Sequence, residues 1–222
     1  MSFSKEWDSI YQANKHMSIW PWSDLITYVK RNLPNIDDKY YVLELGCGAG
    51  ANISFFQQLN VNYFATEGSS HIVKYLTDKF PSLAKNIKVA DFTKEIPFDQ
   101  TFDLIFDRGS VCCNNTNSIE NCISLISKHL KPGGLFIGID WPSKLHTEFN
   151  NGIFADDMYT KNNFPPGPFY NIGLTHFFDR LHIQELFKGY EFIKMEHKRV
   201  KQEFPESDYQ SANWNFAVKK PE

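Results

Sequence analysis

The sequence has no long apolar run and no excess of positive charge. None of its 222 residues lies in a stretch of about 18 apolar residues, so no membrane-spanning segment is expected. Residues 1–8 mix Ser, Lys, Glu and Trp and offer no apolar core for a signal peptide, which indicates a cytoplasmic location. The formal net charge of −3 gives no electrostatic footprint for nucleic acid, and a small molecule is the favoured ligand.

Cysteine is scarce, and the four cysteines are not arranged as metal ligands. Cys47 and Cys122 stand alone, whereas Cys112 and Cys113 are adjacent. No Cys-x-x-Cys pair accompanies a set of histidines, so we expect no metal site. Free thiols suit a reducing compartment. Internal repeats and low-complexity tracts are also missing, which indicates a single domain over residues 1–222; nothing in the sequence indicates an oligomeric state.

Short apolar runs alternate with helical patterns over the first two thirds of the chain. Strands are expected at residues 40–45, 61–66, 87–90, 102–106 and 135–139. Helices are expected over residues 52–59, over 69–80 with Ser69 or Ser70 as the cap, and from a capping box at Asn117 and Glu120 to a break at residues 131–134. The alternation predicts an α/β fold with a doubly wound parallel sheet.

The last third of the chain changes character. Asp179 is expected to cap a short helix that ends at Phe187, and residues 190–197 and 213–218 to pair as a β-hairpin. Residues 141–176 match no regular element, although their aromatics and prolines are typical of a packed functional loop. We therefore expect a lid-like insertion at residues 141–178, for which a surface insertion without function is the alternative. We also expect an N-terminal cap segment at residues 1–36.

Three glycines lie between the first strand and the first helix after it, in V-L-E-L-G-C-G-A-G from Val42 to Gly50. Such a turn lets backbone N–H groups approach an anionic or zwitterionic ligand at the positive end of a helix. On its own the motif is ambiguous, because Gly46-x-Gly48-x-x-Ala51 also fits a loosened dinucleotide-binding pattern. Glu67, at the end of the second strand, suits a ribose in either class.

Three further features separate the two classes. Glu44, inside the first strand, is suited to a cationic amino acid rather than to a pyrophosphate. Asp91-Phe92 follows the third strand and offers a carboxylate for an adenine amino group and a ring for the adenine face. Lys131-Pro132-Gly133-Gly134 directly precedes the fifth strand. This set resembles the pattern of class I S-adenosylmethionine-dependent methyltransferases, most strongly over residues 40–140.

The resemblance implies a fold, a cofactor and a set of binding residues. The fold is a Rossmann-like, doubly wound sheet of seven strands whose last strand is antiparallel. The cofactor is S-adenosyl-L-methionine, and its product is S-adenosyl-L-homocysteine. The implied cofactor-binding residues are Tyr11, Trp22, Glu44, Gly46, Cys47, Gly48, Gly50, Glu67, Gly68, Asp91, Phe92 and Asp107.

The fourth strand is followed by Asp107-Arg108-Gly109-Ser110, which resembles small-molecule methyltransferases such as the thiopurine and thiol methyltransferases. It differs from the N-P-P-Y motif of enzymes that methylate adenine or glutamine amides. Asp107, Arg108 and Ser110 are thus the first catalytic candidates, although an Arg–Asp ion pair beside a turn glycine explains the same residues. A hydroxyl or carboxyl acceptor would benefit from a base, for which His176 is the first candidate and His146 the second.

Aromatic residues also gather near the amino end. Tyr11, Trp20 and Trp22 either wall the cofactor pocket, where their faces would attract a sulfonium, or pack a helix over residues 23–33 onto the sheet. We predict that residues 20–22, residues 107–110 and the lid around Trp141 and His176 meet over the transferred methyl group.

These features predict an enzyme that transfers a methyl group by in-line displacement to a small-molecule acceptor, a metabolite or a glycan precursor. Two alternatives remain: a non-catalytic S-adenosylmethionine-binding module and a nicotinamide-dependent oxidoreductase. The chain has no second dinucleotide-binding half, which disfavours the oxidoreductase. An RNA substrate has only the basic cluster at residues 194–201 in its favour, and Glu196 interrupts that cluster.

Overall fold

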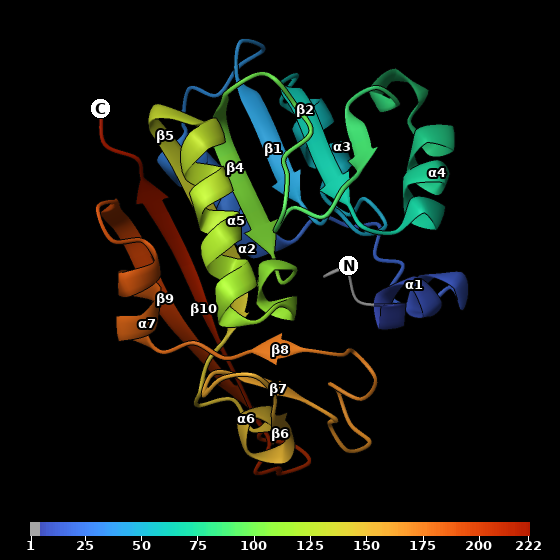
Figure 1. The fold of residues 1–222 in the computed structure, drawn as a ribbon, viewed down its shortest axis with the longest axis vertical. Helices are drawn as coiled ribbons and strands as arrows, with labels where there is room; N and C mark the ends of the chain where they lie inside the picture. Colours follow the sequence, from blue (N-terminus) through green and yellow to red (C-terminus); the bar gives the residue numbers. More distant parts are fainter. Residues whose placement is uncertain (1–4) are drawn as a thin grey trace.

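A mixed seven-stranded sheet forms the centre of the computed structural model, which describes residues 5–222 (Figure 1). Its strand order is β3-β2-β1-β4-β5-β10-β9. The strands are β1 (Tyr41–Leu45), β2 (Asn62–Glu67), β3 (Ile87–Val89), β4 (Phe102–Arg108), β5 (Leu130–Pro142), β9 (Glu191–Lys201) and β10 (Gln210–Lys219). The first five are mutually parallel, and β10 is antiparallel to both of its neighbours. The predicted seven-stranded, Rossmann-like sheet with its last strand antiparallel is confirmed.

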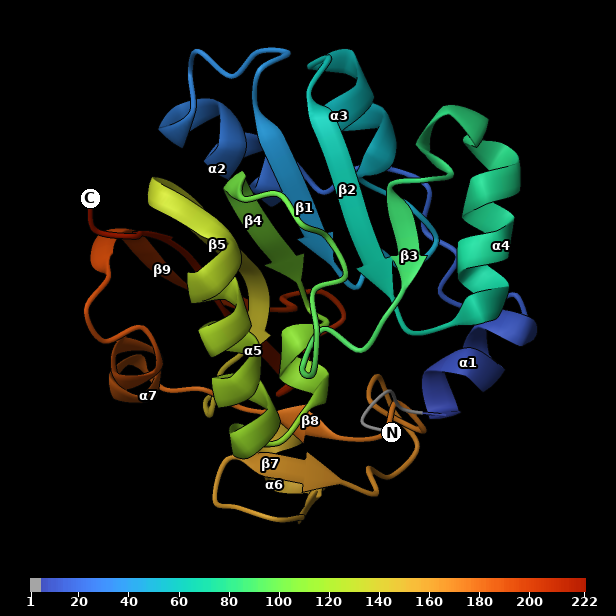
Figure 2. The same ribbon diagram turned by 45° about the horizontal axis from the view of Figure 1, so that its top comes forward.

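Helices cover both faces of the sheet, as an apolar parallel sheet requires (Figures 1 and 2). The first face packs against α2 (Ser23–Asn32), α3 (Ile53–Gln58) and α4 (Ser70–Lys79), in a core that includes Phe56 and Phe106. The second packs against α5 (Thr116–His129) and α7 (Arg180–Leu186), in a core that includes Phe136 and Phe216. Short 3-10 helices, η1 (Pro81–Leu83) and η2 (Val111–Cys113), lie in the connections.

One helix lies at the edge of the sheet instead of on a face. This helix, α1 (Lys5–Gln12), is next to the N-terminal end of α4, beyond the carboxyl ends of β1 and β2 (Figure 2). Ser69 Oγ donates to Asp8 Oδ1 over 2.6 Å and so ties α1 to the start of α4. Of the predicted cap segment 1–36, α1 lies at this edge, whereas α2 packs on a face of the sheet; residues 1–4 are outside the described part of the chain.

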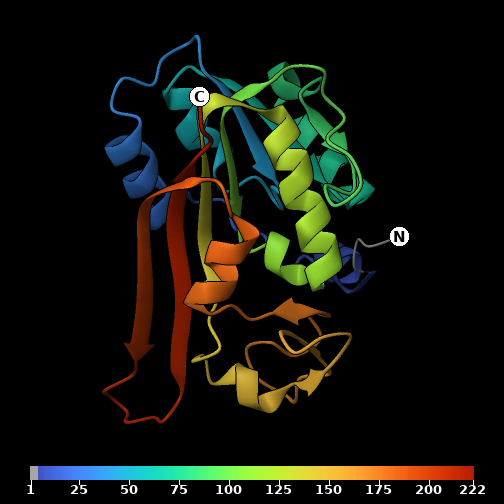
Figure 3. The same ribbon diagram turned by 60° about the vertical axis from the view of Figure 1, so that its left-hand side comes forward.

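Two boundaries differ from the sequence prediction. Asn115, not Asn117, caps α5, because its side chain accepts the backbone N–H of Ser118. The glycine pair at residues 133–134 does not precede the fifth strand but belongs to β5, where it bonds through its backbone to Lys220. The long antiparallel partner β10 therefore extends β5 beyond its predicted bounds. The hairpin of β9 and β10 reaches past the rest of the sheet (Figure 3).

The largest difference concerns residues 143–178, which we call the inserted module. Far from being irregular, it contains α6 (Glu148–Asn151) and a second sheet of β6 (Ile153–Phe154), β7 (Thr160–Asn162) and β8 (Thr175–His176). Strands of two or three residues are too short to show alternation in a sequence, which is why the prediction was wrong. Asp157 organises the module by accepting the backbone N–H groups of Tyr159 and Thr160 and of Thr116 in α5.

Candidate functional site

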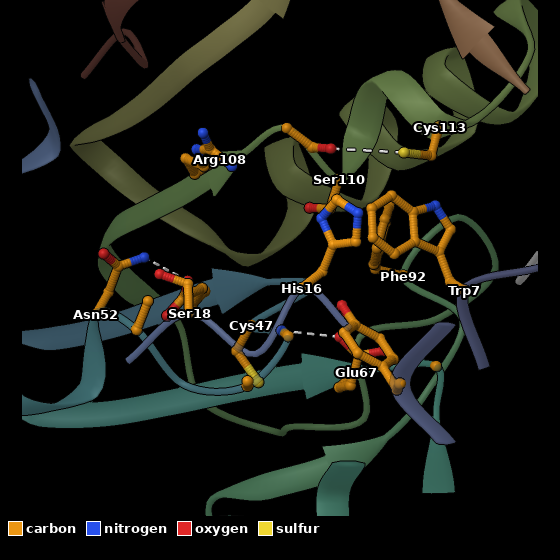
Figure 4. Close-up of a pocket in the computed structure, with 18 of the residues that line it drawn as sticks. Trp7, His16, Ser18, Cys47, Asn52, Glu67, Phe92, Arg108, Ser110 and Cys113 are labelled. Atoms are coloured by element: carbon orange, nitrogen blue, oxygen red, sulfur yellow. Dashed lines mark hydrogen bonds between the residues drawn. The ribbon is translucent and has the colours of Figure 1, made fainter. Parts of the chain in front are cut away.

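A cavity of about 420 Å³ lies at the carboxyl ends of β1, β2, β3 and β4, where ligands bind in open α/β sheets (Figure 4). We call it the pocket. Its floor is the turn between β1 and α3, which contains the predicted glycines. Its sides are the residues that follow β2, β3 and β4, and its cover is the segment from α1 to Trp22. Segments distant in the sequence thus converge on one space.

The glycine turn can pack against its neighbours only because its glycines have no side chains. Gly46 has φ +69°, and a Cβ atom at this residue would lie 2.5 Å from Cβ of Ser110. Gly48 has φ +50°, and a Cβ atom there would lie 3.0 Å from Oη of Tyr11. Gly46, Cys47 and Gly48 line the pocket, whereas Gly50 faces Leu76 in the core. Burial raises the pKa of the Cys47 thiol well above its ordinary value, so this cysteine is an inert wall residue.

Glu67, the last residue of β2, holds the turn in place from below. One carboxylate oxygen accepts the N–H of Gly48 over 2.9 Å, and the other accepts the N–H of Ser69 over 3.0 Å. Burial raises the pKa of Glu67, while the backbone donors at Ser69, Gly48 and Gly68 act in the opposite direction. Glu67 and the adjacent Gly68 both line the pocket, so Glu67 borders the cavity as well as the turn.

Glu44 also lines the pocket and is almost completely buried. Its carboxylate accepts Asn52 Nδ2 over 2.8 Å and the hydroxyl of Tyr63. Burial raises the pKa of Glu44 to about 8, because its charged form is poorly solvated. No Lys or Arg side chain of residues 5–222 forms an ion pair with Glu44. A buried acid beside a cavity, without a cationic partner, suits a cationic ligand group.

Asp91 and Phe92 follow β3 and also line the pocket. The Asp91 carboxylate accepts the N–H and the hydroxyl of Thr93 and forms an ion pair with Lys94. The Phe92 ring reaches toward the glycine turn, and its Cε1 lies 3.4 Å from the position of a Cβ atom at Gly46. A carboxylate and an aromatic ring are therefore presented together, as the sequence predicted from their adjacency.

Of the residues at the end of β4 and after it, some support the pocket from below and others line it. Asp107 is fully buried and does not line the pocket; its carboxylate accepts the N–H groups of Ser110 and Val111 and the indole N–H of Trp141, the last over 2.7 Å. Burial raises the pKa of Asp107, and these donors oppose that shift. Ser110 does line the pocket, but its hydroxyl is held between Asp107 and the carbonyl oxygen of Leu45. Asp107 thus fixes the turn that presents Ser110.

Arg108 lines the pocket while it is engaged on both sides. Its guanidinium carbon lies 3.6 Å from the ring centroid of Trp22, and its Nη2 lies 3.0 Å from Asp140 Oδ2. Arg108 therefore forms an Arg–Asp ion pair, but with Asp140 and not with the adjacent Asp107, and this pair orients the guanidinium over Trp22.

The N-terminal segment closes the pocket. Tyr11 is buried over the glycine turn and under Trp7, with 5.8 Å between the two ring centroids. Trp22 lines the pocket and also packs against the core below α2, so the two alternatives given for it both hold. Trp20 is 77% exposed and lies outside the pocket.

The structure does not bring the inserted module to the pocket. His176 is fully buried, with Nδ1 2.9 Å from Thr160 Oγ1 and Nε2 2.9 Å from His182 Nε2. Burial lowers the pKa of His176 to about 3 and that of His146 to about 4. Trp141 is a buried residue of β5. We predicted that residues 20–22, residues 107–110 and the lid around Trp141 and His176 meet at one site. The lid does not line the pocket, so this part of the prediction is wrong; His16 and Ser18 line the pocket instead.

Sequence reasoning missed several residues that line the pocket: Trp7, His16, Ser18, Asn52, Cys113 and Asn114 (Figure 4). Asn52 had a signal, since it follows the glycine turn and its amide is one of the two groups that hold Glu44. His16 and Ser18 had none, because they belong to a segment without periodicity or motif that the packing of α1 brings over the pocket.

Comparison with known proteins identifies the kind of domain. Residues 42–134 match the model of a methyltransferase domain family, a range that holds the glycine turn, Glu67 and Asp91. No curated protein matches the sequence. Among solved structures, an S-adenosylmethionine-dependent methyltransferase from Clostridium acetobutylicum is 18% identical, with a TM-score of 0.64 over 99% of this chain and 98% of that one.

Two other solved structures share the fold. The first is a 1,6-didemethyltoxoflavin N1-methyltransferase from Burkholderia thailandensis with bound S-adenosylhomocysteine; it is 15% identical, with a TM-score of 0.59 over 88% of this chain and 76% of that one. The second, a chain from Rhodobacter sphaeroides described as a putative zinc-dependent alcohol dehydrogenase, is 11% identical, with a TM-score of 0.71 over 99% of each chain. At these identities the likeness concerns the fold alone.

The fold and the site together define a Rossmann-like methyltransferase domain with a ligand pocket at the strand ends. Residues 42–134 match a methyltransferase domain family, and the described chain has the fold of S-adenosylmethionine-dependent methyltransferases of known structure. Within residues 5–222, no group of three or more His, Cys, Asp or Glu side chains could hold a metal ion. No helix of the described chain is long and apolar enough to cross a membrane.

Proposed function

We propose that the pocket binds S-adenosylmethionine and that the enzyme transfers its methyl group to a small-molecule acceptor. The observation that carries this proposal is the convergence, around one cavity of about 420 Å³, of the glycine turn, two buried acids and Asp91-Phe92 under an aromatic cover. This volume lies in the usual range of small-molecule sites, about 300–1,000 Å³.

The residues present fit the parts of this cofactor. The amino-acid part belongs at the glycine turn, where Glu44 is a buried acid without a cationic partner and would receive the ammonium group. The ribose belongs at Glu67, which borders the pocket. The adenine belongs at Asp91 and Phe92, with the carboxylate for its amino group and the ring for its face. Tyr11 and Trp22 present aromatic surface to the sulfonium from the cover.

The bound cofactor would supply an activated methyl group on a good leaving group, and the chain's own residues would supply alignment. Holding two reactants in line contributes a large share of the rate in such a displacement. Asp107 fixes the turn that carries Ser110, and the Asp140–Arg108–Trp22 stack fixes one wall. The cover from α1 to Trp22 would exclude water from the reacting groups.

A small acceptor agrees with the charge of the chain, because the net charge of −3 does not attract nucleic acid. The Burkholderia enzyme of the same fold holds a small acceptor, 1,6-didemethyltoxoflavin, beside its cofactor product.

Calorimetry with S-adenosylhomocysteine and with NAD tests the binding proposal. The wild type should bind S-adenosylhomocysteine, and Glu67→Ala should weaken this binding by about 1–3 kcal/mol, the cost of losing a charge-assisted hydrogen bond. Glu120→Ala, at an exposed glutamate of α5, is the matched control and should bind as the wild type does. Equal affinity of Glu67→Ala, or a preference of the wild type for NAD, contradicts the proposal.

Incubation with cofactor labelled in its methyl group and fractionated cell extract tests the transfer. Label in a compound of low molecular mass is the expected result, and the labelled product identifies the acceptor. Binding of S-adenosylhomocysteine without transfer to any fraction would point to a non-catalytic binding module, and label in RNA or protein would overturn the small acceptor.

A further inference from the structure

His16 occupies the pocket without any role in the proposed cofactor site. It lies in the turn after α1, with φ +56°. Its ring contacts Trp7 edge to face, with 5.4 Å between the ring centroids, and His16 lines the pocket although the residue as a whole is exposed.

The ring of His16 lies between the two ends of the pocket. In Figure 4, Asn52 and Ser18 lie on one side of it and Glu67 and Trp7 on the other, and the ring points toward Ser110. Under the proposed function these sides hold the amino-acid part and the adenosine part of the cofactor. The sulfonium joins those parts, so its methyl group belongs near the middle of the pocket, where His16 is.

The other titratable groups of the pocket are poorly placed to accept a proton from an acceptor. Glu44 and Glu67 each have both carboxylate oxygens in hydrogen bonds, and Asp91 bonds Thr93 and pairs with Lys94. Burial raises the pKa of Tyr11 and of Cys47, Cys113 donates to the carbonyl oxygen of Gly109, and Arg108 is a permanent cation. Imidazole is the side chain best suited to take a proton near neutral pH.

We propose that His16 is the residue that accepts the acceptor's proton during methyl transfer; this inference rests on the proposed function. A lone pair of the His16 ring takes the proton of the acceptor's X–H group while a lone pair of X forms the bond to the methyl carbon. The carbon–sulfur bond breaks and its electron pair stays on sulfur, which leaves methylated X, S-adenosylhomocysteine and an imidazolium that returns the proton to water. The acceptor class is therefore one whose X–H group has both a lone pair and a proton to lose, a hydroxyl or a neutral amine.

The test uses sinefungin, which carries an amine at the place of the transferred methyl group, and S-adenosylhomocysteine, which carries nothing there. Both dissociation constants are measured by calorimetry at pH 8 for the wild type and for His16→Asn. Asparagine tolerates the left-handed backbone of residue 16, so the variant removes the imidazole without adding strain. His71→Asn, at an exposed histidine of α4 outside the pocket, is the matched control.

We expect the wild type and His71→Asn to prefer sinefungin, since neutral His16 can accept a hydrogen bond from its amine. In His16→Asn the preference for sinefungin over S-adenosylhomocysteine should fall about tenfold, while the affinity for S-adenosylhomocysteine is retained.

Each contrary result has a separate meaning. An unchanged preference in His16→Asn, or an equal loss of affinity for both ligands, overturns the role of His16 and leaves the cofactor site intact. Failure of the wild type to bind either ligand overturns the proposed function, and the role of His16 with it.

Discussion

The pocket and the inserted module both bury polar residues, but they bury them in different ways. In the pocket, Glu44 and Glu67 lie beside a cavity, and glycines stand where side chains would fill the space. In the module, His176 bonds Thr160 and also His182 of the neighbouring α7, and the rings of Tyr159 and Phe178 pack against both histidines. A polar residue next to a glycine-lined cavity is available to a ligand, whereas one whose partners are all internal supports the fold.

The largest effect on stability and on ligand affinity should come from a substitution that fills space in the pocket. Gly46→Ala adds a Cβ atom 2.5 Å from that of Ser110 at a residue with φ +69°. We expect it to lower the free energy of unfolding by about 2–4 kcal/mol, from backbone strain and overpacking, and to weaken S-adenosylhomocysteine binding more than tenfold. Urea unfolding and calorimetry measure the two effects.

Gly189→Ala is the control for backbone strain alone. Gly189 has φ +91°, but a Cβ atom there meets no atom of the described chain within 4 Å. Its cost should be about 1–2 kcal/mol, with ligand affinity unchanged. If Gly46→Ala behaves like Gly189→Ala, the close approach at the pocket floor is not what the site requires.

The next largest effect should be a dependence of the free energy of unfolding on pH, which arises from the inserted module. Burial lowers the pKa of His176 from 6.5 to about 3 in the folded protein, so between these values the unfolded chain binds a proton that the folded chain does not. Stability is therefore lost as the pH falls below 6.5, by about 1.4 kcal/mol per pH unit and about 2 kcal/mol at pH 5. His146, whose pKa burial lowers to about 4, adds to this loss.

His176→Asn separates the module from the pocket. When unfolding in urea is measured between pH 7 and pH 5, the free energy of unfolding of His176→Asn should depend less steeply on pH than that of the wild type. The difference in slope should correspond to about one proton. Since His176 lies outside the pocket, affinity for S-adenosylhomocysteine should not change at pH 7. A tenfold loss of affinity in a variant that is still folded would return His176 to the list of site residues.

Hydrogen exchange compares the mobility of the two regions. Addition of S-adenosylhomocysteine should slow exchange at residues 5–22 and 46–50, which cover and floor the pocket, and leave residues 143–178 nearly unchanged. Strong protection of residues 143–178 would mean that they close on the ligand after all, as the lid-like insertion expected from the sequence would do.

The smallest effect should come from loosening the cover. Asp8→Ala removes the acceptor of the Ser69 hydroxyl, which ties α1 to α4. We expect S-adenosylhomocysteine to bind about two- to fivefold more weakly, the scale of one exposed hydrogen bond. Asp78→Ala, at an exposed residue of the same helix α4, is the control. An Asp8→Ala variant that binds as tightly as the control would show that this bond does not hold the cover.

The pocket and the module also differ in how far the sequence predicts them. The glycine turn, Glu67 and Asp91 were predicted because each is defined by its place at the end of an apolar strand, and strand ends of a parallel sheet meet at one edge. Asp107 was predicted to be a binding residue but lies below the pocket, since the sequence does not tell which way a side chain at a turn points.

The remainder depends on packing between distant segments. His16 reaches the pocket only because α1 docks on α4, and no pattern around residue 16 announces that contact. The module folds around Asp157, whose partners include Thr116, 41 residues away. Interactions of this kind leave no periodicity in the sequence, so neither could be predicted from it.

A crystal structure of the enzyme with S-adenosylhomocysteine tests the central claim most directly. The account predicts the amino-acid part at the glycine turn with its ammonium near Glu44, the ribose at Glu67, and the adenine between Asp91 and Phe92, with His16 facing the sulfur. A ligand bound anywhere else, or bound here with its adenine at Glu44 and its amino-acid part at Phe92, would contradict the account.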